Sequence, residues 1–315
     1  MQMLKWFVGA LALLALACGG VSEPSTPVIR DGEGLLELPL VSTSAGRSYK
    51  LVGATFAITG PQNTTLTDTS ADSVSVALMA GTYSIQMNGN WHVERTDAPG
   101  VTVPVTLVSP NPMTFILDEG ETRPVRFLFK VPGDGTADVR VGVDSGGWIS
   151  GTLQFNPRTP PPTYPGGPNI PDPFADVAGK TVPFVISFDS STVTRSTAGG
   201  YKHVDIQTSP VTLQFGGATG AVFQQQFVSA LQGQTLSFSM ATPFPTSMFI
   251  GPVKLENQER GVRLEVFFSD LFPGADAEGY SLLQPTSFNE GAIDFYFAGA
   301  GTIGSQISNG TFAPR

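Results

Sequence analysis

The chain has 315 residues, a formal net charge of −9, 14% charged residues, 41% hydrophobic residues and 22 phenylalanines. This length and apolar content argue against a disordered chain and fit two domains of ordinary size, each able to bury a core. An acidic surface without a cluster of Lys or Arg repels phosphate groups, which argues against nucleic acid as a partner and against anchoring through a polybasic segment.

The first segment, residues 1–17, is predicted to be a signal peptide. One positive charge at Lys5 precedes an apolar run of eleven residues, 6–16. A helix that crosses the hydrocarbon core of a bilayer needs about 20 apolar residues, so this run is too short for a membrane span. A short basic start, a short apolar region and small residues at its end are the features of a signal peptide.

A lipid anchor is predicted at Cys18, which is the only cysteine of the chain. The residues Ala15-Leu16-Ala17-Cys18 resemble the lipobox of bacterial lipoproteins, although the position of Ala15 is more often Leu in that family. The resemblance implies cleavage before Cys18 and attachment of fatty acids to this residue. An ordinary secretory peptide is the alternative, and it would leave one unpaired thiol in an exported protein.

Residues 18–30 are small, polar and interrupted by proline, which predicts a flexible lipidated tether. Residue 19 is Gly and not Asp. By resemblance to the sorting of Gram-negative lipoproteins, this favours the outer membrane. We therefore expect an exported protein that is anchored through Cys18 to a bacterial membrane, the outer one, and that resembles the uncharacterised surface lipoproteins of Gram-negative bacteria.

Residues 31–156 are predicted to form an N-terminal β-sandwich domain. Apolar residues alternate with small or polar ones, as at Val74, Val76 and Leu78. Strict alternation places one face of a strand in a core and the other in solvent, which is typical of antiparallel sheets. Clusters of Gly, Pro and Asn between the alternating runs indicate turns.

Two stretches of this region, 52–61 and 74–85, resemble the small prealbumin-like and carboxypeptidase-regulatory-like sandwich modules. In those modules an extended strand is followed by an apolar strand that ends in a Gly-Thr-Tyr corner, which here is Gly81-Thr82-Tyr83. The resemblance implies a sandwich fold for the first domain and carries no activity with it.

Residues 157–174 are predicted to be a proline-rich linker between two domains, since residues 156–173 contain eight prolines. Proline lacks an N–H group and fixes φ, so the segment cannot form a strand ladder or a helix interior. We interpret it as a semi-rigid spacer. The alternative is a ligand for a proline-recognition module.

Residues 175–315 are predicted to form a C-terminal β domain with the same alternation, as at Val262, Leu264 and Val266. In one segment, 221–231, the apolar residues lie four apart, which fits a short helix. A strand is the alternative for this segment. The fold class expected for the whole chain is all-β, with two antiparallel β-sandwich-like domains joined by the proline-rich linker.

No catalytic residue, cofactor or metal ligand is assigned from the sequence. His92 and His203 lack the spacing of a zinc site and are interpreted as solvated side chains. Asp144-Ser145-Gly146-Gly147 resembles the nucleophile motif of trypsin-like proteases, but only His92 precedes it, so we interpret it as a β-turn. The acidic loops 134–138 and 276–279 are candidate calcium sites, with solvated turn carboxylates as the alternative.

The candidate ligand-contact residues are Trp91, Trp148 and Tyr296. Sugar rings pack on exposed aromatic rings, and both tryptophans neighbour turns. Tyr296 is out of phase with the apolar residues Phe295 and Phe297, which predicts that it lies on an outer face. The alternative is that the two tryptophans fill the core at strand ends.

The expected function is non-enzymatic binding or scaffolding in the cell envelope. We expect a monomer whose partner, besides the membrane, is an envelope protein or a carbohydrate. The alternative is an envelope polysaccharide hydrolase with two carboxylates about 5 to 10 Å apart. Those two cannot be chosen from the 26 acidic residues by sequence alone.

Overall fold

The computed structural model describes residues 27–44, 47–131, 139–141, 146–159, 171–217, 219–244, 247–269 and 271–314. Strands make up 59% of the structure and helices 4%, so the predicted all-β class is confirmed. The signal peptide, Cys18, most of the tether and residues 160–170 of the proline-rich segment lie outside the described residues.

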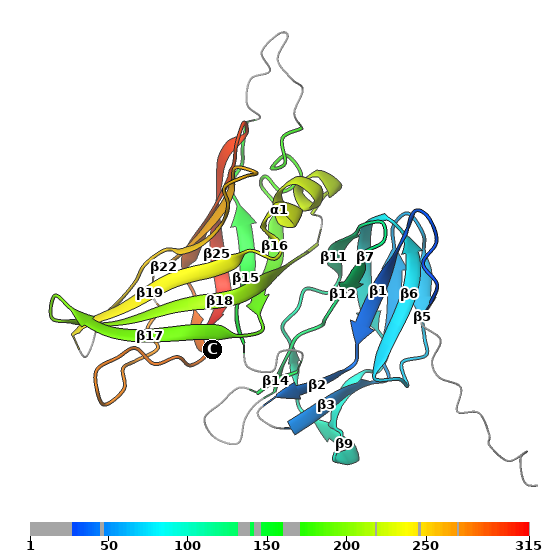
Figure 1. The fold of residues 1–315 in the computed structure, drawn as a ribbon, viewed down its shortest axis with the longest axis horizontal. Coiled ribbons are helices and arrows are strands. Elements are labelled where there is room, and N and C mark those ends of the chain that lie inside the picture. Colours follow the sequence, from blue (N-terminus) through cyan, green and yellow to red (C-terminus); the bar gives the residue numbers. More distant parts are fainter. Residues whose placement is uncertain are drawn as a thin grey trace, which may run out of the picture.

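The first unit consists of short strands around one apolar core (Figure 1). The sheet orders are β12-β1-β6, β2-β3-β8-β9, β10-β13-β14 and β11-β7-β4-β5. The bounds are β1 Glu33–Pro39, β2 Val41–Ser44, β3 Arg47–Val52, β4 Thr55–Thr59, β5 Thr64–Leu66, β6 Ser73–Met79, β7 Gly81–Asn88, β8 His92–Arg95, β9 Ala98–Val103, β10 Thr106–Leu107, β11 Met113–Leu117, β12 Thr122–Pro124, β13 Phe129–Val131 and β14 Val139–Val141.

The core of the first unit follows from the alternation in its strands. Leu36 of β1, Phe56 of β4 and Ile85 of β7 are each at most 1% exposed and belong to one cluster. Tyr83, in the Gly-Thr-Tyr corner, is 1% exposed, and its hydroxyl donates a hydrogen bond of 2.7 Å to the Met79 carbonyl. The likeness of this unit to prealbumin-like modules stays a prediction.

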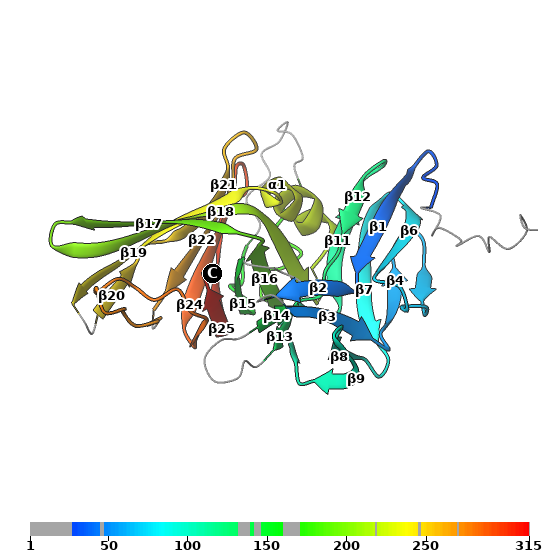
Figure 2. The ribbon, with the colours of Figure 1, turned by 60° about the horizontal axis from the view of Figure 1, so that its bottom comes forward.

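The second unit is an eight-stranded barrel with extra strands, and this corrects the predicted sandwich (Figure 2). Its strands pair in the order β15-β16-β18-β19-β21-β22-β24-β25, and β25 closes the ring against β15. The bounds are β15 Gly147–Phe155, β16 Thr181–Phe188, β17 Ser191–Ala198, β18 Tyr201–Gly216, β19 Thr235–Phe244, β20 Ser247–Ile250, β21 Val253–Asn257, β22 Val262–Phe268, β23 Thr286–Phe288, β24 Gly291–Phe297 and β25 Gly301–Ala313.

The barrel interior is packed with apolar side chains, and a helical segment fills one end. Residues 221–231 are helical, with η1 at Phe223–Val228 and α1 at Ser229–Leu231, so of the two predicted possibilities the helix is formed. Phe223 and Phe227 stack at 5.4 Å and both contact Phe295 of β24. A small eight-stranded barrel is just wide enough for such side chains to fill it.

The proline-rich segment connects two adjacent strands of the barrel, and not two domains. β15, which precedes the segment, pairs along its length with β16, which follows it. The two ends of the segment are also held together, because Arg158 Nε lies 3.3 Å from Asp172 Oδ2 and both side chains are nearly buried. The barrel therefore begins at Gly147, within the range predicted for the first domain. Proline content shows that a segment is not a strand, but not what it connects.

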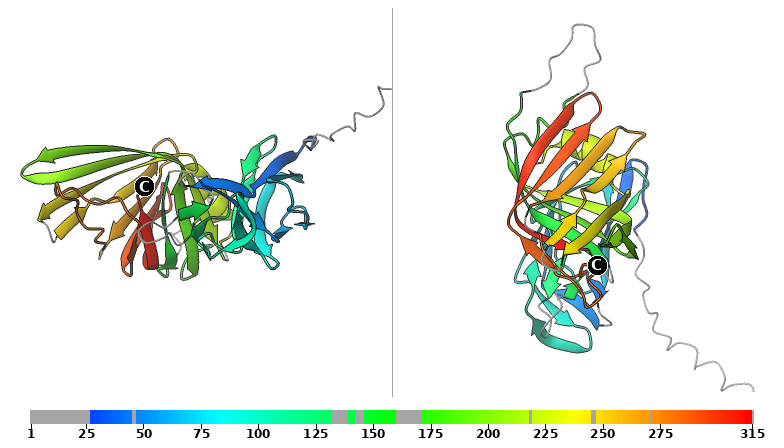
Figure 3. Two further views of the ribbon diagram at one scale, coloured as in Figure 1. Left: turned by 90° about the horizontal axis from the view of Figure 1, so that it is seen from below. Right: turned by 90° about the vertical axis from the view of Figure 1, so that its left-hand side faces the viewer.

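The two units lie side by side along the long axis of the molecule and share one sheet (Figure 3). Thr114 of β11 pairs with Phe215 of β18, and Met113 pairs with Gly216. The sheet that contains the barrel thereby continues into β11-β7-β4-β5 of the first unit, with 15 strands in all.

Candidate functional site

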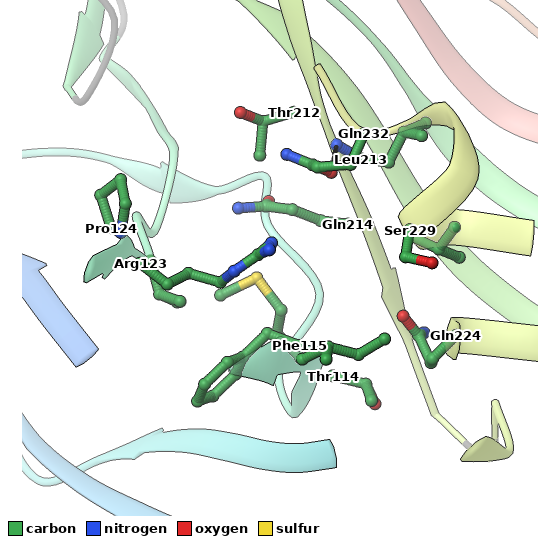
Figure 4. Close-up of a pocket in the computed structure, with 14 residues that line it drawn as sticks. Thr114, Phe115, Arg123, Pro124, Thr212, Leu213, Gln214, Gln224, Ser229 and Gln232 are labelled. Carbon is green, nitrogen blue, oxygen red and sulfur yellow. Dashed lines mark hydrogen bonds between the residues drawn. The ribbon is translucent and has the colours of Figure 1, made fainter. Parts of the chain in front are cut away.

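A groove lies between the two units, where β11 and β18 separate beyond their two paired residues (Figure 4). Its walls come from β11, from β12 and the residue after it, from β18 and from the helical segment. The groove contains ≈ 500 Å³ of empty space, part of it open to solvent.

Arg123 of β12 supplies the positive charge of the groove, and Glu121 holds it in place. The Arg123 Nε donates a hydrogen bond of 2.9 Å to Glu121 Oε1, and Nη2 lies 2.8 Å from the same oxygen. The backbone N–H of Asp118 donates to the other carboxylate oxygen at 3.0 Å. Because one Glu121 oxygen faces both Nε and Nη2, the Nη1 side of the guanidinium is the part left for a ligand.

Three glutamines form the opposite wall. Gln232 accepts a hydrogen bond of 3.0 Å from the Leu213 N–H through its side-chain oxygen, much as a neighbouring strand would. Gln224 is 1% exposed, and its amide donates to Thr219 Oγ1 at 3.1 Å. Amides and hydroxyls do not titrate near neutral pH, so this wall suits hydrogen bonding to a ligand and not proton transfer.

The third glutamine, Gln214, ties the two units together. Its side-chain oxygen accepts a hydrogen bond of 2.9 Å from Ser109 Oγ, and its amide donates to the Arg126 carbonyl at 2.8 Å. Ser109 Oγ in turn accepts from the Leu128 N–H at 2.8 Å. Gln214 is 4% exposed, so this network is shielded from water.

Sequence reasoning missed this role of Gln214. The apolar residues Val211, Leu213 and Phe215 alternate with Gln214 and predict that its side chain lies on the solvent face of β18. The alternation is correct for the barrel, but the first unit covers that face. Arg123 and Gln232 were missed because they line one groove only when the two units, which are distant in sequence, lie against each other.

We expect Gln214→Ala to lower the free energy of unfolding by about 1–3 kcal/mol, because buried partners in the first unit lose their hydrogen bonds. Urea denaturation of the purified chain measures this. Gln207→Ala is the matched control, since Gln207 is exposed on the same strand and its loss should cost less than about 0.5 kcal/mol. Equal midpoints for the two variants would show that Gln214 does not support the junction.

The three aromatic residues chosen from the sequence lie in different surroundings. Trp148 is 4% exposed in a cluster with Leu128 and Val185, so it fills the junction between the units and offers no surface to a ligand. Trp91 packs against the first core, with its ring 5.3 Å from Phe129. The core role that was the alternative therefore describes Trp148, whereas Trp91 is only partly buried. Tyr296 is 36% exposed on the outer face of the barrel. Its alternation with Phe295 and Phe297 predicts this position.

The two histidines lie in separate units. His92 Nε2 lies 2.7 Å from Glu94 Oε1, and the Gly100 N–H donates to Glu94 Oε2 at 2.8 Å. These two contacts, the Gly100 N–H first, lower the pKa of Glu94. His203 lies on β18 beside the ring of Tyr201, with centroids 6.4 Å apart.

The acidic loop 276–279 is organised by its own contacts. One oxygen of Asp276 accepts hydrogen bonds from the N–H groups of Glu278 and Tyr280, and the other lies 3.0 Å from Arg195. The loop thus fits the alternative of a turn carboxylate. Within the described ranges, no group of three His, Cys, Asp or Glu could hold a metal ion. The loop 134–138 and the residues Asp144 and Ser145 lie outside them.

Comparison with known proteins gave no relatives: no protein-family model, curated protein or solved structure matches this chain. Among the residues that the structure places, no helix is long and apolar enough to cross a membrane.

Proposed function

We propose that this protein is a lipoprotein of the bacterial envelope, anchored through Cys18, with a non-enzymatic binding or scaffolding role. The observation that carries the non-enzymatic part is the lining of the groove. The 14 residues drawn around it include Arg123, amides, hydroxyls and apolar side chains, but no Asp or Glu. A lining of this kind suits recognition of a ligand, because hydrogen-bond donors and acceptors surround a small apolar recess.

In this proposal, the length of the tether determines how far the two units can lie from the membrane. Pro27, the first described residue, lies nine positions after Cys18. A chain of that length reaches at most about 30 Å when fully extended. The first unit would therefore lie next to the membrane, with the barrel beyond it. The shared sheet and the buried hydrogen bonds of Gln214 would then join the barrel to the first unit, and a scaffold needs such a connection.

The alternative hydrolase would need two carboxylates across a cleft. The test is to incubate the full-length protein, extracted from the membrane fraction in mild detergent, with purified envelope polysaccharide and to measure new reducing ends. We expect protein in the membrane fraction and no reducing ends above those of a protein-free sample. Reducing ends that increase in proportion to protein concentration would contradict the proposal.

A further inference from the structure

The outer face of the barrel around Tyr296 has the parts of a small polar binding site. Tyr296 lies on β24, opposite Thr302 of β25, and its diagonal neighbour on that strand is Gly304. Diagonal neighbours on antiparallel strands are about 7–8 Å apart, within reach of an aromatic side chain. Gly304 has no side chain, so the side chains of neighbouring residues can approach the strand beside the tyrosine ring closely.

Two polar side chains converge over Gly304. A Cβ atom placed on Gly304 would lie 3.1 Å from Asn156 Nδ2 and 3.3 Å from Asp294 Oδ1. Within the part of the chain that the structure describes, neither side chain has a hydrogen-bond partner, and both are exposed. A hydrogen-bond donor and a charged acceptor therefore lie close together over Gly304, on the same face of the barrel as an aromatic ring.

The ring of Tyr296 is held in position from its other side. The Arg263 guanidinium lies 5.3 Å from the centre of the ring, and Arg263 Nε lies 3.3 Å from Glu265 Oε1. Lys254 lies 3.2 Å from the same oxygen. The Arg263 contact restrains the Tyr296 ring, which lowers the entropic cost of binding a ligand.

We infer that the face formed by Tyr296, Asp294, Asn156 and Gly304 binds a pyranose unit of a neutral carbohydrate. The C–H groups of a sugar ring would pack on Tyr296, because the ring face is the negative side of its quadrupole. Adjacent sugar hydroxyls would accept from Asn156 Nδ2 and donate to Asp294 Oδ1. Acidic sugars are disfavoured because they would place a like charge against Asp294. This inference rests on the proposed binding role, and it adds a site apart from the groove between the units with a ligand class of its own.

The test is calorimetric titration of the full-length protein in detergent with two neutral hexasaccharides, cellohexaose and chitohexaose, and with an acidic hexagalacturonate. We expect at least one neutral hexasaccharide to bind and the acidic one not to bind. Tyr296→Ala should weaken binding about tenfold, which is the upper range for loss of one aromatic contact. Gly304→Ala should weaken it by a similar factor, because the new methyl group would displace the ends of the Asn156 and Asp294 side chains.

Gly304→Ala also tests binding without a loss of folding. Gly304 has no positive φ, and its close neighbours are the ends of two exposed side chains that can move. Its melting temperature should match the parent chain. Gln207→Ala, on a distant part of β18, is the control that should bind as the parent chain does. Failure of both neutral sugars to bind, or binding that is unchanged in both Tyr296→Ala and Gly304→Ala, overturns this site. Cleavage of a hexasaccharide, seen by mass spectrometry of the same samples, would instead contradict the proposed non-enzymatic function.

Discussion

Replacement of Phe223 by Ala should lower the free energy of unfolding by about 3–5 kcal/mol, the usual cost of removing a buried phenyl ring. Phe223 is 0% exposed and closes one end of the barrel. Its ring contacts Phe155 of β15 at 6.2 Å, Phe215 of β18 at 5.3 Å and Phe295 of β24 at 6.1 Å. One side chain thus joins three strands that are far apart in the sequence, and its removal leaves a cavity that the closed sheet cannot fill.

The measurement is denaturant unfolding followed by circular dichroism at equilibrium. Gln225→Ala is the matched control, because Gln225 is exposed on the same helical segment and its one side-chain contact is a 3.4 Å approach to Thr82. That change should cost less than about 0.5 kcal/mol. A cost for Phe223→Ala as small as that of the control would mean that the helical segment does not support the barrel.

Substitution of Cys18 by Ser should abolish incorporation of labelled palmitate and leave a precursor that is uncleaved or soluble. The expected effect is complete, because the chain has no second cysteine to accept the lipid. Burial of acyl chains contributes about 0.8 kcal/mol per CH₂ group, so two or more chains hold a protein on a membrane essentially permanently. Metabolic labelling followed by membrane fractionation measures both consequences.

The control for the anchor is Ser25→Ala, a change of similar size within the tether that leaves Ala15-Leu16-Ala17-Cys18 intact. It should take up palmitate as the parent chain does. Undiminished labelling of Cys18→Ser would show that the lipid is attached elsewhere, and the predicted anchor would then be wrong.

Sequence alternation predicted strands such as β22 and the side of that strand that is buried. Val262, Leu264 and Val266 are at most 1% exposed in β22, as their spacing predicts. The same period of two occurs in sandwiches and in barrels, so alternation cannot distinguish them. Closure of the barrel depends on the pairing of β15 with β25, between residues at opposite ends of the unit, such as Ile149 with Phe312. No local pattern reports such a pairing.

The candidate sites were predicted less well than the strands, for a related reason. Tyr296 was placed correctly because its exposure depends on its own strand. For Trp148, the sequence left open whether the ring is exposed to a ligand or buried in a core. Its burial depends on contact between the two units, which no local pattern reports. The site at Gly304 is also invisible in sequence, since Asn156 and Asp294 meet there only when β15, β25 and β24 are neighbours.

The central claim is that this chain is a lipid-anchored envelope protein, and the mass of its N-terminal peptide tests it most directly. The protein would be extracted from membranes, digested and analysed by mass spectrometry. The account predicts a peptide that begins at Cys18 and carries the added mass of its fatty acids. A peptide that begins at Met1, or an unmodified Cys18 in the membrane-bound protein, would contradict the account.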